Sequence, residues 1–230
     1  MKNKIVFVAC DTSSIKVVKK ILNKTKTNEL NIIPKFGLEF FYSKKGREFL
    51  ENLKKDFFLD LKINDISNTA KASINSIKDL KGCKYLTVHA SGGLNMIKAV
   101  KENARKINKK IQILVVTVLT SLNNKALKEI GYTKSVKQLV LKQASLAKET
   151  GCGLICSAEE SKIVKKKYKN MFIVTPGIRL PGDQKDDQSR IVTPYEALKR
   201  LRADAIVIGR SLTKNKIENN VKRLIDHLSE

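Results

Sequence analysis

The segment FFLDLKIND, residues 57–65, carries ionisable residues inside an apolar run. Asp60 and Lys62 are two positions apart, and side chains two apart on a β-strand project to the same side. Asp65 follows just beyond the run. An unpaired charge is costly to bury, so these groups must compensate one another. The segment therefore predicts a network of paired charges, which is either a structural ion-pair network or a functional site with perturbed pKa values.

Chemically useful residues also end most of the other short apolar runs. They are Asp11, Lys35, His89, Thr120, Ser121, Arg179 and Arg210. Any one of them alone would be an ordinary polar residue at the end of a strand, and we interpret His89 in that way. Two lysines and three aspartates that converge on one rim are harder to explain as strand ends, so they favour a functional site over a purely structural network.

The apolar runs are rich in residues that favour β-strands, and they alternate with segments of helical spacing. The runs cover residues 5–11, 31–36, 57–62, 85–90, 111–119, 153–158, 171–176 and 205–209, and the helical segments include 14–24, 46–55, 68–80, 93–106, 135–149 and 193–202. This alternation indicates a parallel sheet that is buried on both faces. About eight βα units predict an α/β fold, a single-domain (β/α)8 TIM barrel over residues 1–230. A doubly wound open sheet is the alternative, but no GxGxxG follows the first strand to support a dinucleotide site.

The last two strand ends of such a barrel indicate the kind of ligand. Active sites of these barrels lie at the carboxyl ends of the strands, and the loops after strands seven and eight often bind phosphate. Arg179 and Arg210 fall in those loops, each close to a glycine that lets the backbone approach a ligand. Arginine pairs with phosphate through two parallel hydrogen bonds. The sequence therefore predicts a phosphorylated small molecule, with the long irregular stretch 179–192 as a functional lid or a disordered loop.

The composition excludes several classes of function. The formal net charge is +24, but the excess is mostly lysine scattered along helical segments, which a solvated surface explains better than a nucleic-acid partner. Four cysteines and two histidines give no zinc-ligand spacing, so we expect buried thiols and no metal. No apolar stretch approaches the roughly 20 residues that span a bilayer, and no signal-type cleavage site follows the first run. We therefore expect a cytoplasmic protein with no membrane partner.

The motifs resemble those of the orotidine 5′-phosphate decarboxylase family, of bacterial type, along essentially the whole chain. The most specific element is FLDLKINDISNT, residues 58–69, which resembles the Asp-x-Lys-x-x-Asp signature of the family and its following Asn-Thr. PKFGLEFF, VTVLTS, GLICSAEE, VTPGIRLPGDQKDDQSR and AIVIGRSL resemble other blocks of the family in order and spacing. Ser67 stands where proline is common in the family, a difference that affects only the stiffness of the local loop.

This resemblance implies cofactor-independent decarboxylation of orotidine 5′-monophosphate to UMP, in de novo pyrimidine biosynthesis. Lys62 would deliver a proton to C6 of the pyrimidine, Asp60 would lie against the substrate carboxylate, and Lys35 would hold the charge array in place. Asp65 and Thr69 would reach the substrate from the partner subunit of a homodimer. The other substrate-binding residues would be Asp11 on the ribose side, Thr120 near the base, and Arg179, Gln188, Gly209 and Arg210 on the phosphate beneath the loop 180–190.

Two other classes of function stay open at this point. A metal-assisted sugar-phosphate decarboxylase or aldolase of the same suprafamily would use a similar motif with magnesium, and it could recruit Glu39 or Asp60 as a ligand. The pair Asn68-Thr69 and the long loop that carries Gln188 argue against it. A basic nucleic-acid-binding protein that only keeps the barrel would instead bind any polyanion in a strongly salt-dependent way.

Overall fold

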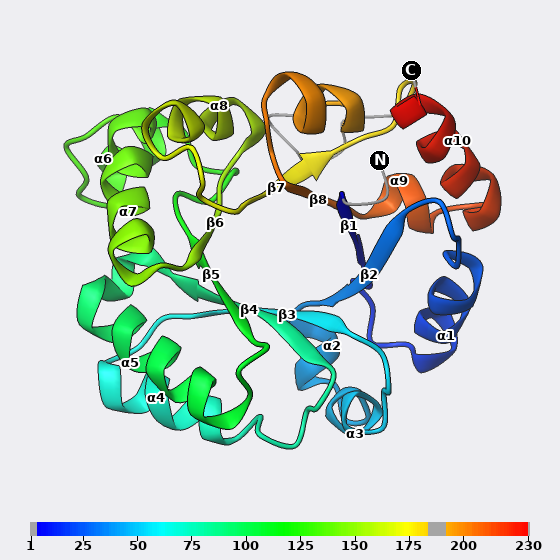
Figure 1. Cartoon of the computed structure of the whole chain (residues 1–230), viewed down its shortest axis with the longest axis horizontal. Coiled ribbons are helices and arrows are strands. Elements are labelled where there is room, and N and C mark those ends of the chain that lie inside the picture. Colours follow the sequence, from blue (N-terminus) through cyan, green and yellow to red (C-terminus); the bar gives the residue numbers. More distant parts are fainter. Residues whose placement is uncertain (1–3, 184–191, 230) are drawn as a thin grey trace.

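The structure is a computed structural model that describes residues 4–183 and 192–229. Within these residues, eight strands close into a barrel in the order β1 to β8, and each neighbouring pair is parallel. The helices surround the ring of strands on its outer side (Figure 1). The (β/α)8 barrel predicted from the alternating pattern is therefore confirmed.

Each strand is apolar because both of its faces are buried. The strands are β1 (Ile5–Ala9), β2 (Asn31–Phe36), β3 (Phe57–Ile63), β4 (Cys83–His89), β5 (Gln112–Val116), β6 (Gly153–Ile155), β7 (Ile173–Ile178) and β8 (Ala205–Ile208). Successive side chains point alternately into the barrel and toward the helices. Phe7, Phe58 and Tyr85 pack together inside it, with ring centroids 4.8, 5.0 and 6.2 Å apart. This packed interior forms an apolar floor beneath the carboxyl ends of the strands.

The helices cover the outer face of the barrel. They are α1 (Ile15–Lys24), α2 (Leu38–Tyr42), α3 (Gly46–Glu51), α4 (Ser67–Asn75), α5 (Gly93–Ile107), α6 (Asn124–Glu129), α7 (Val136–Thr150), α8 (Ala158–Lys167), α9 (Arg210–Thr213) and α10 (Ile217–Ser229), with a 3-10 turn at Ala90–Gly92 and a π-helix at Glu196–Arg200. The short helices α2, α6 and α9 were not predicted from the helical spacing. At the start of α8, Glu160 accepts a 2.9 Å hydrogen bond from the backbone N–H of Ser157, so a Ser-x-x-Glu pattern marks the beginning of that helix.

Two predicted strands end earlier than their apolar runs. The run 111–119 forms a strand only to Val116, and the run 153–158 forms one only to Ile155. Val118 and Cys156, which follow these ends, line the central cavity. Apolar residues that face a cavity look like strand residues in a sequence, because both kinds of position are shielded from water.

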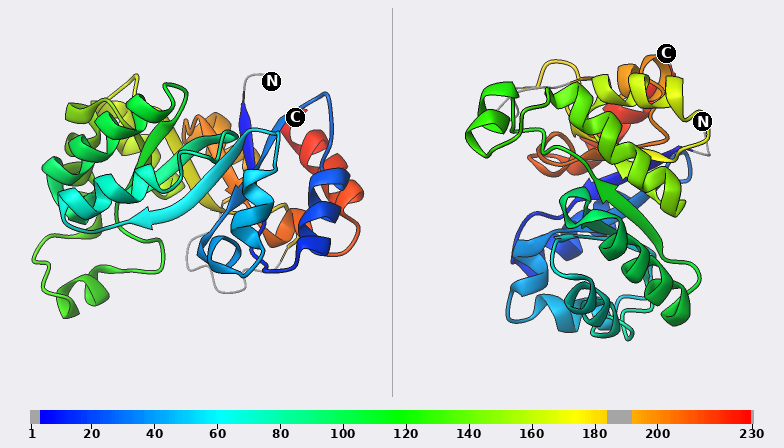
Figure 2. Two further views of the ribbon diagram at one scale, coloured as in Figure 1. Left: turned by 90° about the horizontal axis from the view of Figure 1, so that it is seen from below. Right: turned by 90° about the vertical axis from the view of Figure 1, so that its left-hand side faces the viewer.

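The segment around α6 stands apart from the rest of the barrel. Its helix and the adjoining loops, coloured green, extend beyond the ring of strands in the side view (Figure 2, left). The segment begins with Leu119 and Thr120, which line the cavity. The projecting element is thus joined directly to the wall of the candidate site.

All four cysteines are buried and carry free thiols, as the sequence predicted. Burial raises the pKa of the Cys10 thiol and of the Cys83 thiol to about 12. Among residues 4–183 and 192–229, no helix combines the length and the apolar character needed to cross a membrane.

Candidate active site

A cavity of about 460 Å³ opens at the carboxyl ends of the strands. Its walls come from loops and strand ends that lie far apart in the sequence, as expected for a barrel of this type. Eight of the residues predicted from the sequence line it: Asp11, Lys35, Asp60, Lys62, Thr120, Arg179, Gly209 and Arg210. The barrel therefore brings most of the predicted site into one hollow.

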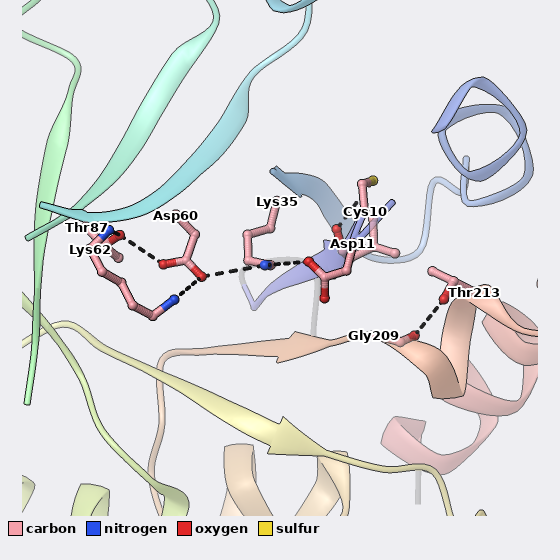
Figure 3. Close-up of polar contacts among 9 residues, drawn as sticks. Cys10, Asp11, Lys35, Asp60, Lys62, Thr87, Gly209 and Thr213 are labelled. Carbon is pink, nitrogen blue, oxygen red and sulfur yellow. Dashed lines mark hydrogen bonds and ion pairs between the residues drawn. The ribbon is translucent and has the colours of Figure 1, made fainter. Parts of the chain in front are cut away.

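Four of these residues form a row of alternating charges across β1, β2 and β3. The Nζ atom of Lys62 lies 2.9 Å from Oδ2 of Asp60, and the Nζ atom of Lys35 lies 3.5 Å from the same oxygen. Lys35 also donates a hydrogen bond of 3.0 Å to Oδ1 of Asp11. Figure 3 shows the row as one connected chain of contacts. Each charge has a partner of opposite sign. This pairing offsets the free-energy cost of removing charged groups from water in an apolar segment.

Exposure differs along the row, whose two ends, Asp11 and Lys62, are more exposed than its middle; the Asp11 side chain is 62% exposed. The exposed fraction of the side chain is 8% for Lys35, 14% for Asp60 and 36% for Lys62. Lys35 is thus the buried support of the row, while Lys62 is the ammonium group that a ligand can reach. A proton donor needs this combination of a fixed position and an accessible end.

The neighbouring charges keep the row ionised. Burial by itself would raise the pKa of Asp60, but the ammonium groups of Lys35 and Lys62 and hydrogen bonds from Lys62 and Thr87 outweigh it, and the pKa lies below its ordinary value of 3.8. Burial would lower the pKa of Lys35, but the carboxylates of Asp60 and Asp11 raise it above its ordinary value of 10.5. Both groups are therefore charged at neutral pH.

The depressed pKa of Asp60 predicts a loss of stability in acid. Since the unfolded chain takes up a proton first, Asp60 stabilises the fold fully above about pH 3.8, and this contribution disappears as the pH falls through the lower folded-state pKa. Urea unfolding at a series of pH values below about 5 should therefore show a smaller acid loss of unfolding free energy for Asp60→Asn than for the unmodified protein. Parallel curves for the two proteins would contradict this assignment.

The opposite side of the cavity carries the two arginines. Gly177 has a φ of 77°, in the left-handed region that favours glycine, and the β7–β8 pairing shifts register between Thr175 and Ile178. This irregular turn precedes Arg179, which is buried and donates to the carbonyl oxygen of Ile178. Arg210 is the first residue of α9. The two guanidinium groups make this side of the cavity suited to a phosphate group.

A second hollow of about 320 Å³ continues this basic side outward. It shares Arg179 and Arg210 with the main cavity and adds Lys214 and Arg223 to its lining. Asp183, also in its lining, forms a 2.9 Å ion pair with Arg223. The net positive charge around both arginines increases the attraction for an anionic group.

Two further predicted site residues that the structure describes, Asp65 and Thr69, do not line the cavity in this chain. Asp65 and Thr69 are exposed, and the Asp65 carboxylate accepts a 2.7 Å hydrogen bond from the backbone N–H of Ile66. Gln188 lies outside the described residues, as do residues 184–190 of the predicted loop 180–190. That Asp65 and Thr69 serve a neighbouring subunit therefore stays a prediction.

Sequence reasoning missed the apolar wall of the site and one buried hydroxyl group. Phe58, Val116, Ile155 and Val207 line the cavity, and nothing distinguishes them in the sequence from other strand residues. Thr87, on β4, is fully buried and donates a 2.9 Å hydrogen bond to Oδ1 of Asp60. It is a polar residue inside the apolar run 85–90, and that contrast was the available signal.

Glu39 is the carboxylate that the metal-dependent alternative could recruit. Its Oε1 accepts a 2.9 Å hydrogen bond from the backbone N–H of Ser13. Across the described part of the chain, no group of three or more His, Cys, Asp or Glu side chains is arranged to hold a metal ion.

A closed parallel barrel with a paired ammonium–carboxylate row at its carboxyl end, facing two arginines, defines the protein as a (β/α)8-barrel enzyme. The sequence matches the family described as Orotidine 5′-phosphate decarboxylase / HUMPS over residues 4–224. The chain belongs to this family.

Individual relatives carry the name of one enzyme of that family. Orotidine 5′-phosphate decarboxylase of Buchnera aphidicola subsp. Schizaphis graminum is 39% identical over 212 residues, which cover 86% of this chain and 88% of the relative. The enzyme of the same name from Staphylococcus epidermidis is 39% identical over 214 residues, 90% of each chain. The crystal structure of orotidine 5′-phosphate decarboxylase from Lactobacillus acidophilus has a TM-score of 0.81 at 30% identity, covering 99% of this chain and 100% of that one. The enzyme class that the motifs predicted is confirmed.

Proposed function

We propose that the protein decarboxylates orotidine 5′-monophosphate to UMP without a cofactor, in pyrimidine biosynthesis, and that Lys62 is the proton donor to C6. One observation carries this proposal. The Lys62 ammonium group is held 2.9 Å from Asp60 at the mouth of a cavity whose other side carries Arg179 and Arg210. One cavity thus combines a cationic reacting group with two arginines suited to a phosphate, as binding of a nucleoside monophosphate requires.

The reaction explains why an ammonium group is needed. Loss of carbon dioxide leaves an electron pair on C6, in the plane of the pyrimidine ring, where no carbonyl group absorbs it directly. A fixed positive charge at that position lowers the energy of the transition state. Lys62 supplies this charge and then transfers its proton to C6, so that one side chain is both electrostatic stabiliser and general acid.

The rest of the row holds Lys62 in its reactive state. Asp60 keeps the Lys62 ammonium group charged and in place, and Lys35 in turn fixes Asp60 from the buried side. Asp60 is also the group that lies against the substrate carboxylate in this proposal. Asp11, hydrogen-bonded to Lys35, binds the ribose side, and Thr120 lies near the base.

The phosphate end supplies binding energy away from the reacting carbon. Arg179 and Arg210 pair with the phosphate group, and the backbone at Gly209 approaches it at the start of α9. Binding energy from a remote group can offset the cost of desolvating the reacting end. The lysine-rich surface contributes a general attraction for the anionic substrate.

The active form is a homodimer in which Asp65 and Thr69 complete the site of the partner subunit. Two observations support this part of the proposal. Both side chains are exposed in the single chain, and no cationic side chain of the described residues pairs with Asp65. Ile66, next to Asp65, is a large apolar side chain that is 72% exposed, as residues of a protein interface often are before association.

The test is turnover of orotidine 5′-monophosphate by the purified protein in the presence of EDTA. We expect rapid loss of the ultraviolet absorbance of the substrate, with UMP as the product. A folded protein that fails to convert this substrate, but cleaves sugar phosphates when magnesium is added, would replace the proposal with the metal-assisted alternative.

A further inference from the structure

We propose that Thr87 is a positioning residue of the active site, because its single hydroxyl group fixes both the backbone of Lys62 and the carboxylate of Asp60. The inference deepens the proposed function and rests on it. It concerns a residue of β4 that lies behind the charged row and does not line the cavity.

The hydrogen bonds of this hydroxyl group have an unambiguous direction. The backbone N–H of Lys62 can only donate, and it lies 2.8 Å from Oγ1 of Thr87. The Asp60 carboxylate, whose depressed pKa keeps it ionised, can only accept, and its Oδ1 lies 2.9 Å from the same Oγ1. The hydroxyl group therefore accepts from Lys62 and donates to Asp60, and the bond to Asp60 is drawn at the left of Figure 3.

The backbone at Lys62 needs such a support. Its φ is 49°, in the left-handed region, which is unfavourable for a residue with a side chain. The β3–β4 pairing also jumps here, from Leu59 opposite Leu86 to Ile63 opposite Val88, so β3 bulges away from the regular ladder. The Thr87 hydroxyl group replaces the ladder partner that the bulge removes, and the strained conformation is thereby held.

The same hydroxyl group completes the fixation of Asp60. Oδ2 of Asp60 is held by the ammonium groups of Lys62 and Lys35, and Oδ1 is held by Thr87. A carboxylate bound at both oxygens cannot rotate about its Cβ–Cγ bond without breaking a contact. Thr87 therefore fixes the two reacting side chains relative to each other, and this preorganisation is what an electrostatic mechanism requires.

Thr175 provides a matched control within the same barrel. Like Thr87, it is a fully buried threonine within a barrel strand, here β7. Among the described residues its hydroxyl oxygen has no hydrogen-bond partner, and Thr175 does not line the cavity. A change from threonine to valine at Thr175 removes a hydroxyl group from a comparable environment without touching the charged row.

The experiment compares steady-state kinetics and UMP affinity for Thr87→Val, Thr87→Ser and Thr175→Val. We expect Thr87→Val to lower kcat roughly 10- to 100-fold, the usual effect of removing a group that orients a reacting side chain. The dissociation constant of UMP should stay within about 3-fold, since the phosphate and base contacts are unchanged. Thr87→Ser should restore most of kcat because it keeps the hydroxyl group, and Thr175→Val should behave as the unmodified protein.

Three results would overturn the inference: an unchanged kcat in Thr87→Val, an equal loss in Thr87→Ser, or an equal loss in Thr175→Val. If Thr87→Val does not fold, Thr87→Ala and Thr87→Ser replace it as a pair, because both lose the methyl group and they differ only in the hydroxyl group. Failure of the proposed function itself is recognised separately, since the unmodified protein would then neither convert orotidine 5′-monophosphate nor bind UMP.

Discussion

Replacement of Lys62 by alanine should lower kcat for orotidine 5′-monophosphate by at least about 10⁴-fold. General acid catalysis alone contributes about 10²–10⁴-fold, and loss of one preorganised electrostatic group costs about 10²–10³-fold. Lys62 fills both roles in the proposed mechanism, so the two losses combine. The affinity for UMP should change far less than kcat, because the product has no carboxylate and develops no charge at C6.

A second lysine gives a control for the loss of a paired ammonium group. Lys84 forms a 2.7 Å ion pair with Asp56, but this pair is exposed and does not line the cavity. Lys84→Ala should keep kcat unchanged. A Lys62→Ala protein that is folded and still converts substrate within about 10-fold of the normal rate would refute Lys62 as the proton donor.

His89 offers a check on Lys62 that does not depend on turnover. Burial and the Lys62 ammonium group lower the pKa of His89 below its ordinary value of 6.5. Lys62→Ala should therefore raise the pKa of His89, as measured by NMR titration of the imidazole signals. The chain contains two histidines, so the signals are simple to assign, and an unchanged pKa would mean that the Lys62 ammonium group lies elsewhere in solution.

The sequence predicts the charged part of the site well because its residues stand out from their surroundings. Asp60 and Lys62 are conspicuous inside an apolar strand, and Arg179 and Arg210 are conspicuous in a chain dominated by lysine. A parallel barrel brings all its strand ends to one rim, so residues that end different strands must meet. The eightfold alternation was therefore enough to predict that these charged residues share one rim, although His89 and Ser121, which also end apolar runs, do not line the cavity.

The rest of the site depends on features that a sequence does not express. The bulge that gives Lys62 its left-handed backbone appears only when β3 is paired with β4. The role of Thr87 follows from that bulge, and a threonine in a strand is otherwise an ordinary residue. The apolar wall residues, such as Val116 and Ile155, are likewise indistinguishable from core residues until the strands end and the cavity begins.

The apolar wall also has a part in the chemistry. Phe58 and Val207 line the same cavity as the charged row, so in the proposed mechanism a bound pyrimidine would exclude water from the Lys62 ammonium group. Charges interact more strongly when water is excluded. The apolar run that contains Asp60 thus supports the charged row. It also provides a low-dielectric surface that strengthens the electrostatic interactions within the row.

Mixing two inactive proteins should restore activity if Asp65 serves the partner subunit. Lys62→Ala and Asp65→Ala should each retain about 1% of normal turnover or less, because one lacks the proton donor and the other lacks the carboxylate that holds it. In a mixed dimer, one site contains both substitutions and the other contains neither. Random exchange gives half mixed dimers, so turnover should recover to about a quarter of the normal rate, as the symmetry of a two-fold dimer requires.

The controls separate this result from a simple effect of mixing. Lys62→Ala mixed with the double variant Lys62→Ala/Asp65→Ala contains no site with Lys62, and it should stay inactive. If Asp65 instead acted on Lys62 of its own subunit, every site of the first mixture would lack one of the two residues, and no activity would return. Recovery to a quarter therefore requires that Asp65, exposed in the single chain, crosses to the neighbouring cavity.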